Sequence, residues 1–264
     1  MNSDTPKNIY FASDMHLGAP NHQESLIREK RFVDWLNHIT PHTAELFLVG
    51  DIFDFWFEYR HVAPKGYVRL LGKLAEMSDS GIKIHIFSGN HDIWYGPYLE
   101  EQLSAEIHRG PITKTFFGKN FYIAHGDGLG PGDHGYKLLK WFLSTRLTHA
   151  LLRFMHPDWA IGLATWFSRM SNSHNYDGKK EKIKVPLEKE RLYIHSNILV
   201  KEQPELDYMV FGHRHIVLEE AIGEKATCFI LGDWIEFDTY LEVRPDGASL
   251  KNWSQENLAV VSES

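Results

Sequence analysis

Apolar and polar positions follow two different periods along the first half of the chain. Residues 25–38 and 67–77 place apolar side chains at helical spacing. Short apolar runs bounded by polar or turn residues predict buried strands at 8–13, 45–50, 83–88 and 121–125. Because the first three strands alternate with the two helices, this order predicts a mostly parallel sheet with helices packed on it.

The middle of the chain shows a different pattern. Residues 136–170 contain no strand signal and predict two helices, 136–155 and 158–170. Pro157 cannot continue the first helix, and Asp158 is expected to cap the second. A third helix is predicted over 187–202, and strands return at 208–211, 227–231 and 239–243. We therefore expect a core domain of residues 1–133 and 185–264, interrupted by a helical insertion of residues 134–184.

The composition narrows the possible chemistry. The 264 residues include sixteen histidines and one cysteine, Cys228. Abundant imidazole favours metal binding or acid–base chemistry, and a single thiol excludes a disulfide framework and a Cys-rich zinc module. The net charge of −7 leaves no overall basic footprint for nucleic acid. With no apolar leader core and no stretch long enough to span a bilayer, a cytoplasmic protein is expected.

Five of the predicted strands end in residue types that bind metals. These are Asp14 and His16, Asp51, Asn90 with His91 and Asp92, His125, and His213 and His215. The carboxyl ends of parallel strands share one edge, where α/β folds place their sites. In extended backbone, the side chains of residues i and i+2 point to the same side, so the two members of each D-x-H or H-x-H pair are expected to bind one ion. Glycines at 50, 89, 126 and 212 are expected to let the backbone turn beside them.

The ligand types indicate which ions would bind. Carboxylate, imidazole and amide ligands without a thiolate favour Mn²⁺, with Zn²⁺ or Fe as alternatives, over Mg²⁺ or Ca²⁺. Two such ions side by side neutralise a phosphoryl group and activate water. Each motif alone is common on surfaces and in turns. Five motifs in order, each after an apolar run, predict one site with two divalent metal ions.

The motif order D-x-H, GD, GNHD, HGD and GHxH resembles the calcineurin-like metallophosphoesterases. The resemblance implies a four-layer α/β/β/α core with two sheets and a dinuclear site. It implies that one ion is held by Asp14, His16, Asp51 and His215. It implies that the other is held by Asp51, Asn90, His125 and His213, with Asp51 bridging. It also implies that His91 faces the leaving group as a proton donor or charge stabiliser, oriented by Asp92.

The insertion narrows the resemblance further. After His125, the segments GDGLGPGDHGYK and RMSNSHNYDGKK flank an apolar, aromatic pair of helices, as in the UDP-2,3-diacylglucosamine hydrolases of lipid A biosynthesis. That similarity implies attack at the α-phosphorus of UDP-2,3-diacylglucosamine, giving UMP and 2,3-diacylglucosamine 1-phosphate. The implied substrate contacts are Asn90, His91, Asp133, Ser173, Asp177, Lys180 and His213.

Two positions depart from the best-known hydrolases of this group. His91 stands where they carry Arg, and Asp177 stands where they carry Asn. The histidine is the residue that phosphoesterases in general carry. A phosphodiesterase, phosphatase or nuclease that acts on another phosphoester therefore stays an alternative. A non-catalytic metal-binding scaffold is a second alternative, from another functional class.

The insertion has its own charge and composition. Residues 134–184 hold nine Lys or Arg and three Asp or Glu, which is +6 against −13 in the remainder. Basic helices rich in Trp, Phe and Leu favour a cap that meets anionic headgroups on the cytoplasmic face of the inner membrane and receives acyl chains. The alternatives are an ordinary helical hairpin packed on the sheet and a nucleic-acid surface, which the interspersed leucines argue against. The oligomeric state stays open.

Four features beside the expected ligands have alternative interpretations. The aromatic run 53–59 could form a hydrophobic wall near the ions or a dense core loop. Asp54 could tune Asp51 or a bound water, or cap the next turn. Arg214 could reach a phosphate or point away from it. Asp127 and Asp233 are expected to support turns or ligands.

Overall fold

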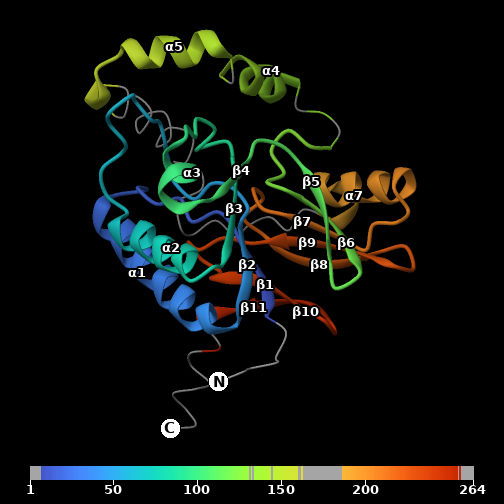
Figure 1. Cartoon of the computed structure of the whole chain (residues 1–264). Helices are drawn as coiled ribbons and strands as arrows, with labels where there is room; N and C mark the ends of the chain where they lie inside the picture. Colours follow the sequence, from blue (N-terminus) through green and yellow to red (C-terminus); the bar gives the residue numbers. More distant parts are fainter. Residues whose placement is uncertain are drawn as a thin grey trace.

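Two stacked β-sheets form the centre of the molecule, shown as a computed structural model in Figure 1. The structure describes residues 7–130, 132, 134–143, 145–159, 162, 186–254 and 256. The first sheet has the order β11 (Gly247–Asn252), β10 (Thr239–Arg244), β1 (Asn8–Ala12), β2 (Thr43–Leu48), β3 (Lys83–Phe87) and β4 (Glu106–His108). The second has the order β5 (Ile112–Phe116), β6 (Lys119–Ala124), β7 (Tyr208–Phe211), β9 (Ala226–Leu231) and β8 (Val217–Ile222).

Each sheet is parallel at its centre. In the first sheet β1, β2, β3 and β4 pair in parallel, and β10 and β11 add antiparallel strands. In the second sheet β6, β7 and β9 are parallel, and β5 and β8 are antiparallel edges. The predicted strands are confirmed, and they divide between two sheets as the resemblance implies. The single shared edge inferred from the strand ends alone is therefore wrong.

Aromatic side chains fill the space between the two sheets. Phe11 and Phe47 stack with their ring centroids 4.7 Å apart, and Phe121 of the second sheet stacks on Phe11 at 6.2 Å. All three rings are fully buried. Aromatic pairs at such distances add attraction to the free energy of burying their apolar area. This inner core sets how the strand ends of one sheet face those of the other.

Helices cover both outer faces of the sheet pair. On the first sheet lie α1 (His22–Ile39), α2 (Val68–Asp79) and α3 (Tyr98–Leu103), with the short turn η1 (Thr40–His42) after α1. On the second lie η2 (Leu187–Lys189) and α7 (Arg191–Glu202). Separate apolar clusters join each helical layer to its sheet. The expected four-layer α/β/β/α core is confirmed (Figure 1).

The helical insertion differs from its prediction in two places. The expected helix 136–155 is two helices, α4 (His134–Leu143) and α5 (Arg146–Phe154). Thr145 lies between them and caps α5, because its hydroxyl accepts a hydrogen bond from the Thr148 amide at 3.2 Å. Residues 157–159 are already helical, so Asp158 is not the N-cap. Pro157 suits the first turn, where its missing amide is not needed. Most of the predicted helix 158–170 lies outside the described residues.

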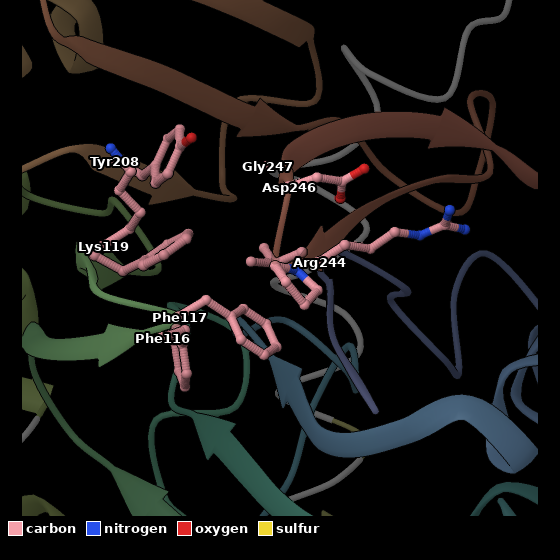
Figure 2. A pocket seen from close by; sticks show the side chains of 10 residues that line it. Phe116, Phe117, Lys119, Tyr208, Arg244, Asp246 and Gly247 are labelled. Atoms are coloured by element: carbon pink, nitrogen blue, oxygen red, sulfur yellow. The ribbon is translucent and has the colours of Figure 1, made fainter. Parts of the chain in front are cut away.

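The end of the sheet pair near the amino terminus of β1 has a small hollow (Figure 2). It lies between the β5–β6 and β10–β11 turns, and Phe116, Phe117 and Tyr208 line it with Lys119 and Arg244. Both cations have acidic partners in the chain: Lys119 faces Asp207 at 3.5 Å, and Arg244 faces Glu242 at 2.8 Å. Because these turns lie at the start of β1, the hollow is at the opposite end of the strands from the predicted ligands.

In the part of the chain that the structure describes, no helix is both long enough and apolar enough to cross a membrane.

Candidate metal centre

The loops after β1, β2, β3, β6 and β7 bring the predicted ligands together. Three groups of side chains have ligand atoms that all lie within 4.8 Å of one another. The groups are Asp14, His16 and His215; His16, Asp51 and His91; and Asp51, His125 and His213. Because β1 to β3 belong to the first sheet and β6 and β7 to the second, the site lies across the seam between the sheets.

Several of these residues have strained backbones. The φ angles are positive at Asp14 (57°), His16 (43°), Asp51 (51°), His213 (67°) and His215 (48°). The expectation that the D-x-H and H-x-H pairs are extended is therefore wrong, because the chain turns at each member. L-residues rarely adopt this conformation, which costs about 1–3 kcal/mol each where it is sparsely populated. Such strain is typical of functional sites, where the surrounding structure holds it in place.

Asp51 lies at the centre of the site. One of its oxygens, Oδ2, is 3.4 Å from His125 Nε2 and 3.7 Å from His16 Nε2. The other, Oδ1, accepts a hydrogen bond from the His91 amide at 2.9 Å. Asp51 thus contacts one histidine from each sheet, which is the position that a bridging ligand needs.

Partners on the far side of each ring orient the other ligands. His125 Nδ1 is 2.8 Å from the Val49 carbonyl, and His215 Nδ1 is 2.9 Å from Asp233 Oδ2. Each contact turns the Nε2 atom inwards, and His215 Nε2 lies 3.6 Å from Asp14 Oδ1. Metal-binding histidines usually have such a carbonyl or carboxylate partner. Asp233 therefore supports a predicted ligand, as expected.

Asn90 joins the two histidines of the second sheet. Its Oδ1 lies 2.8 Å from His213 Nδ1 and 3.3 Å from His125 Nε2. An amide oxygen beside two imidazole nitrogens is a ligand set for a borderline cation. The structure thus brings all seven predicted ligand residues to one place.

The unsatisfied atoms of the site fit a cation. His16 Nδ1, His16 Nε2 and Asp14 Oδ1 are buried, and within the described residues none of them has a hydrogen-bond partner. Buried polar atoms in native proteins are nearly always paired, since an unpaired one costs free energy. Coordination of a divalent ion by a nitrogen of His16 and by Asp14 Oδ1 would remove most of that cost, so the residues present fit a divalent metal.

The charges of the site are strongly coupled. Burial opposes ionisation of Asp51, but the charges of His125 and His91 outweigh it and hold the pKa of Asp51 well below its usual value. Burial likewise opposes the charged form of His125, yet the charge of Asp51 raises the pKa of His125 to about 10. Burial opposes the charged form of His16 too, but the neighbouring carboxylates of Asp14 and Asp54 outweigh it and raise the pKa of His16 to about 10. A cation that binds here replaces protons, so its affinity increases with pH.

Asp92 and Asp54 make contacts other than those expected of them. Asp92 was expected to orient His91, but its carboxylate accepts hydrogen bonds from the backbone amides of Ile52 at 2.8 Å and Gly89 at 2.8 Å and from Tyr95. The carboxylate facing His91 Nδ1 is that of Asp54, at 3.3 Å. The prediction that Asp92 orients His91 is therefore wrong, because its hydrogen bonds hold the loop that carries Asp51.

The family profile of the calcineurin-like phosphoesterases matches residues 7–217 of the chain. The chain belongs to the calcineurin-like phosphoesterase family. The resemblance read from the motif order is thus confirmed.

Similar proteins narrow the relationship. The UDP-2,3-diacylglucosamine hydrolase of Porphyromonas gingivalis is 37% identical over 95% of this chain and 98% of its own length. The protein of that name from Haemophilus influenzae is 25% identical over 86% of this chain and 91% of its own. Among solved structures, the phosphoesterase YfcE from E. coli matches with a TM-score of 0.46 at 15% identity, covering 94% of both chains.

The aromatic run 53–59 and Arg214 both have structural contacts beside the metal centre of this phosphoesterase. In the aromatic run, Phe53, Trp56 and Phe57 are at most 2% exposed, so the run is a dense core loop.

Arg214 donates hydrogen bonds to both carboxylate oxygens of Glu190, at 2.8 and 3.0 Å, and is directed to the start of α7.

Helix α4 is tied to the rim of the site by two contacts that the sequence did not indicate. Lys140 on α4 pairs with Asp127 at 2.6 Å, and the Trp94 indole donates to the Leu143 carbonyl at 2.9 Å. Asp127 follows the predicted ligand His125. The expected substrate residues Asp133, Ser173, Asp177 and Lys180 lie outside the described residues.

Glycines at the site provide space as well as turns. Gly50 and Gly126 have φ angles of 86° and 114°, as expected for tight turns. Gly89 does not have a positive φ angle, but a Cβ atom there would lie 2.1 Å from Asp51 Oδ1 and 2.5 Å from the Asp51 amide. The absence of a side chain at Gly89 is what lets Asp51 occupy its position.

We predict that Gly89→Ala displaces Asp51 and lowers both bound Mn²⁺ and activity. A shift of about 1 Å in a catalytic group costs about 10²-fold in rate. Hydrolysis of bis-p-nitrophenyl phosphate and metal content per chain measure the effect. Gly72→Ala is the matched control, because a Cβ atom there meets nothing within 4 Å and Gly72 lies in helix α2. Full activity and metal content in Gly89→Ala would refute the role given to this contact.

Proposed function

We propose that this phosphoesterase hydrolyses the pyrophosphate bond of UDP-2,3-diacylglucosamine to UMP and 2,3-diacylglucosamine 1-phosphate. The observation that carries the proposal is the 37% identity to the P. gingivalis hydrolase over nearly the whole of both chains. The cluster of carboxylates and imidazoles supports it, since that ligand set suits metal-dependent attack on a phosphorus atom.

The proposed ligands divide into two sets that share Asp51. Asp14, His16, Asp51 and His215 would hold one ion, and Asp51, Asn90, His125 and His213 the other. Mn²⁺ is the proposed metal, because the set offers nitrogen and oxygen but no thiolate. When bound, the two ions neutralise phosphoryl charge and lower the pKa of an attacking water.

His91 is the proposed catalytic side chain. Its Nδ1 is held near the Asp54 carboxylate at 3.3 Å and the Asp54 carbonyl at 3.2 Å. This leaves Nε2 to meet the oxygen of the leaving group, either as a proton donor or as a positive charge. The side chain of His91 is 15% exposed and that of the proposed ligand His215 is 27% exposed, whereas those of Asp14 and Asp51 are almost inaccessible, so His91 is a side chain of the cluster that substrate can reach.

The insertion, residues 134–184, is proposed as a cap separate from the core of 1–133 and 185–264. Its described helices expose large apolar side chains to between 50% and 91%: Leu138, Trp141, Phe142, Leu147, Leu151, Phe154 and Trp159. A hairpin packed on the sheet would bury these side chains, whereas an exposed apolar surface of this kind is typical of lipid or partner contact. We propose that it receives the acyl chains at the cytoplasmic face of the inner membrane, and that Asp133, Ser173, Asp177 and Lys180 contact the head of the substrate.

The substrate assignment predicts selective turnover. The purified protein with Mn²⁺ should release UMP from UDP-2,3-diacylglucosamine with a kcat/KM far above its value for bis-p-nitrophenyl phosphate or nucleotide diesters. Chromatography of the released UMP measures this. Turnover of only the small esters would leave a metallophosphoesterase of another substrate class, and no turnover of any ester would favour a non-catalytic scaffold.

We predict that His91→Asn lowers kcat for the lipid substrate by about 10²–10⁴-fold, the usual contribution of a general acid. Metal content should stay at the wild-type level, since His91 is not one of the proposed ligands. The same substitution at the exposed His42 is the control and should leave kcat unchanged. An unchanged kcat in His91→Asn would remove this residue from the mechanism.

The membrane contact is tested by co-sedimentation with vesicles. Binding should require anionic lipid and weaken in high salt, because basic side chains meet charged headgroups within a Debye length. A Trp141→Ala, Phe154→Ala double variant should sediment less than wild type. The control is a Val68→Ala, Phe117→Ala double variant, which removes two exposed apolar side chains from the surface of the core domain. Equal binding to neutral and anionic vesicles at all salt concentrations would contradict the proposal.

A further inference from the structure

A second group of metal-ligand side chains lies outside the centre described above. His85 on β3 and Glu106 and His108 on β4 have ligand atoms that all fall within 4.8 Å of one another. The side chains of His85 and His108 are only 3% and 8% exposed, whereas that of Glu106 is 66% exposed. Since β4 is an edge strand, this edge cluster has a buried side and a side open to solvent.

The strand register brings the three residues together. His85 and Glu106 are Cα partners in the parallel pair β3–β4, and His108 follows Glu106 by two residues. Residues i and i+2 on a strand share a face, so both β4 side chains lie on the face that His85 occupies. The His85 ring stacks on Phe47 at 4.2 Å, and the His108 ring lies 4.7 Å from Phe87. Both imidazoles are thus held by the aromatic core between the sheets.

The distances within the edge cluster match a tetrahedral ion. His85 Nδ1 lies 3.1 Å from His108 Nε2 and 3.2 Å from Glu106 Oε2, and His108 Nε2 lies 3.8 Å from Glu106 Oε1. Ligands at about 2.0–2.1 Å from a tetrahedral zinc lie about 3.3–3.4 Å apart. His85 Nδ1 is therefore spaced from His108 Nε2 and from Glu106 Oε2 almost as a zinc ion requires, whereas the longer 3.8 Å contact joins His108 to the other oxygen of Glu106.

The outer contacts of His85 determine which of its two nitrogens carries the proton. Its Nε2 lies 2.9 Å from Glu45 Oε2, and the Lys114 ammonium, 2.6 Å from the same oxygen, is 3.1 Å from that nitrogen. The Glu45 carboxylate can only accept a proton from Nε2, which leaves the lone pair of Nδ1 facing His108, whereas the Lys114 ammonium can only donate to Nε2 and favours the other tautomer. A carboxylate behind a histidine is the usual support of a zinc ligand. Burial also lowers the pKa of His108, which keeps that ring neutral and able to bind a metal.

We propose that His85, Glu106 and His108 bind Zn²⁺ or a similar borderline cation at the edge of the first sheet. Two imidazoles and one carboxylate are a known zinc ligand set, with the fourth position left to water on the exposed side of Glu106. The ion would fasten β4 to β3. The Ser88 amide donates to the His108 carbonyl at 2.9 Å, so this fastening extends to the loop that carries Asn90. None of these three residues belongs to the ligand groups around Asp51, so we expect the ion to take no part in the phosphoester chemistry.

Glu106→Gln tests the site without disturbing the buried residues. Equilibrium dialysis against Zn²⁺ followed by metal analysis should find one zinc fewer per chain than in wild type, or a dissociation constant raised more than about 10-fold, since removing even an outer partner of a ligand costs 10–100-fold. Activity with Mn²⁺ should be unchanged. Glu219→Gln, an exposed glutamate on the edge strand β8, is the matched control and should keep the full zinc content. Equal zinc content together with an equal dissociation constant in wild type and Glu106→Gln would overturn the proposal.

Diffraction at the zinc absorption edge provides a second test that does not depend on a variant. Crystals of the wild-type protein equilibrated with Zn²⁺ should show an anomalous peak between His85 Nδ1 and His108 Nε2. Peaks at the Asp51 centre with no peak at the edge cluster would mean that these side chains form only a hydrogen-bonded network.

Discussion

The burial of Asp51 among histidines of both sheets is the interaction on which the site depends. Its side chain is almost inaccessible and lies within 3.7 Å of His16 and His125. A buried carboxylate is costly unless charges or hydrogen bonds compensate it. The missing side chain at Gly89 leaves room for this carboxylate, and the His91 amide donates a hydrogen bond to it at 2.9 Å. The left-handed backbone at five ligand positions turns the chain at the strand ends where the ligands lie.

The aromatic core between the sheets determines whether that arrangement can form. His16 comes from the first sheet and His125 from the second, so a shift of one sheet over the other would separate them. Phe11, Phe47 and Phe121 stack across the seam and fix that relation. The same core holds His85 and His108, so one packed layer positions the catalytic cluster at the strand ends and the edge cluster beside it.

The central strands were predictable from the sequence and the edge strands were not. The four strands that the apolar pattern missed, β4, β5, β8 and β11, are the outermost strands of the two sheets. Each is partly exposed, so it lacks the continuous apolar run that marks a buried parallel strand. The ligand positions were found because they follow buried strands. The residues expected to bind the substrate head group, Asp133 among them, remain expectations.

By itself the sequence determined the ligand types, their order after buried strands, and membership of the phosphoesterase family. Only the tertiary structure decided which strand ends belong to which sheet, that Asp54 rather than Asp92 faces His91, and that His85, Glu106 and His108 converge. The reason is physical: periodicity records how one element is buried, whereas a contact between elements depends on the register and stacking of two. Asp92 adjoins His91 in sequence, yet the turn at the strand end directs its carboxylate to backbone amides.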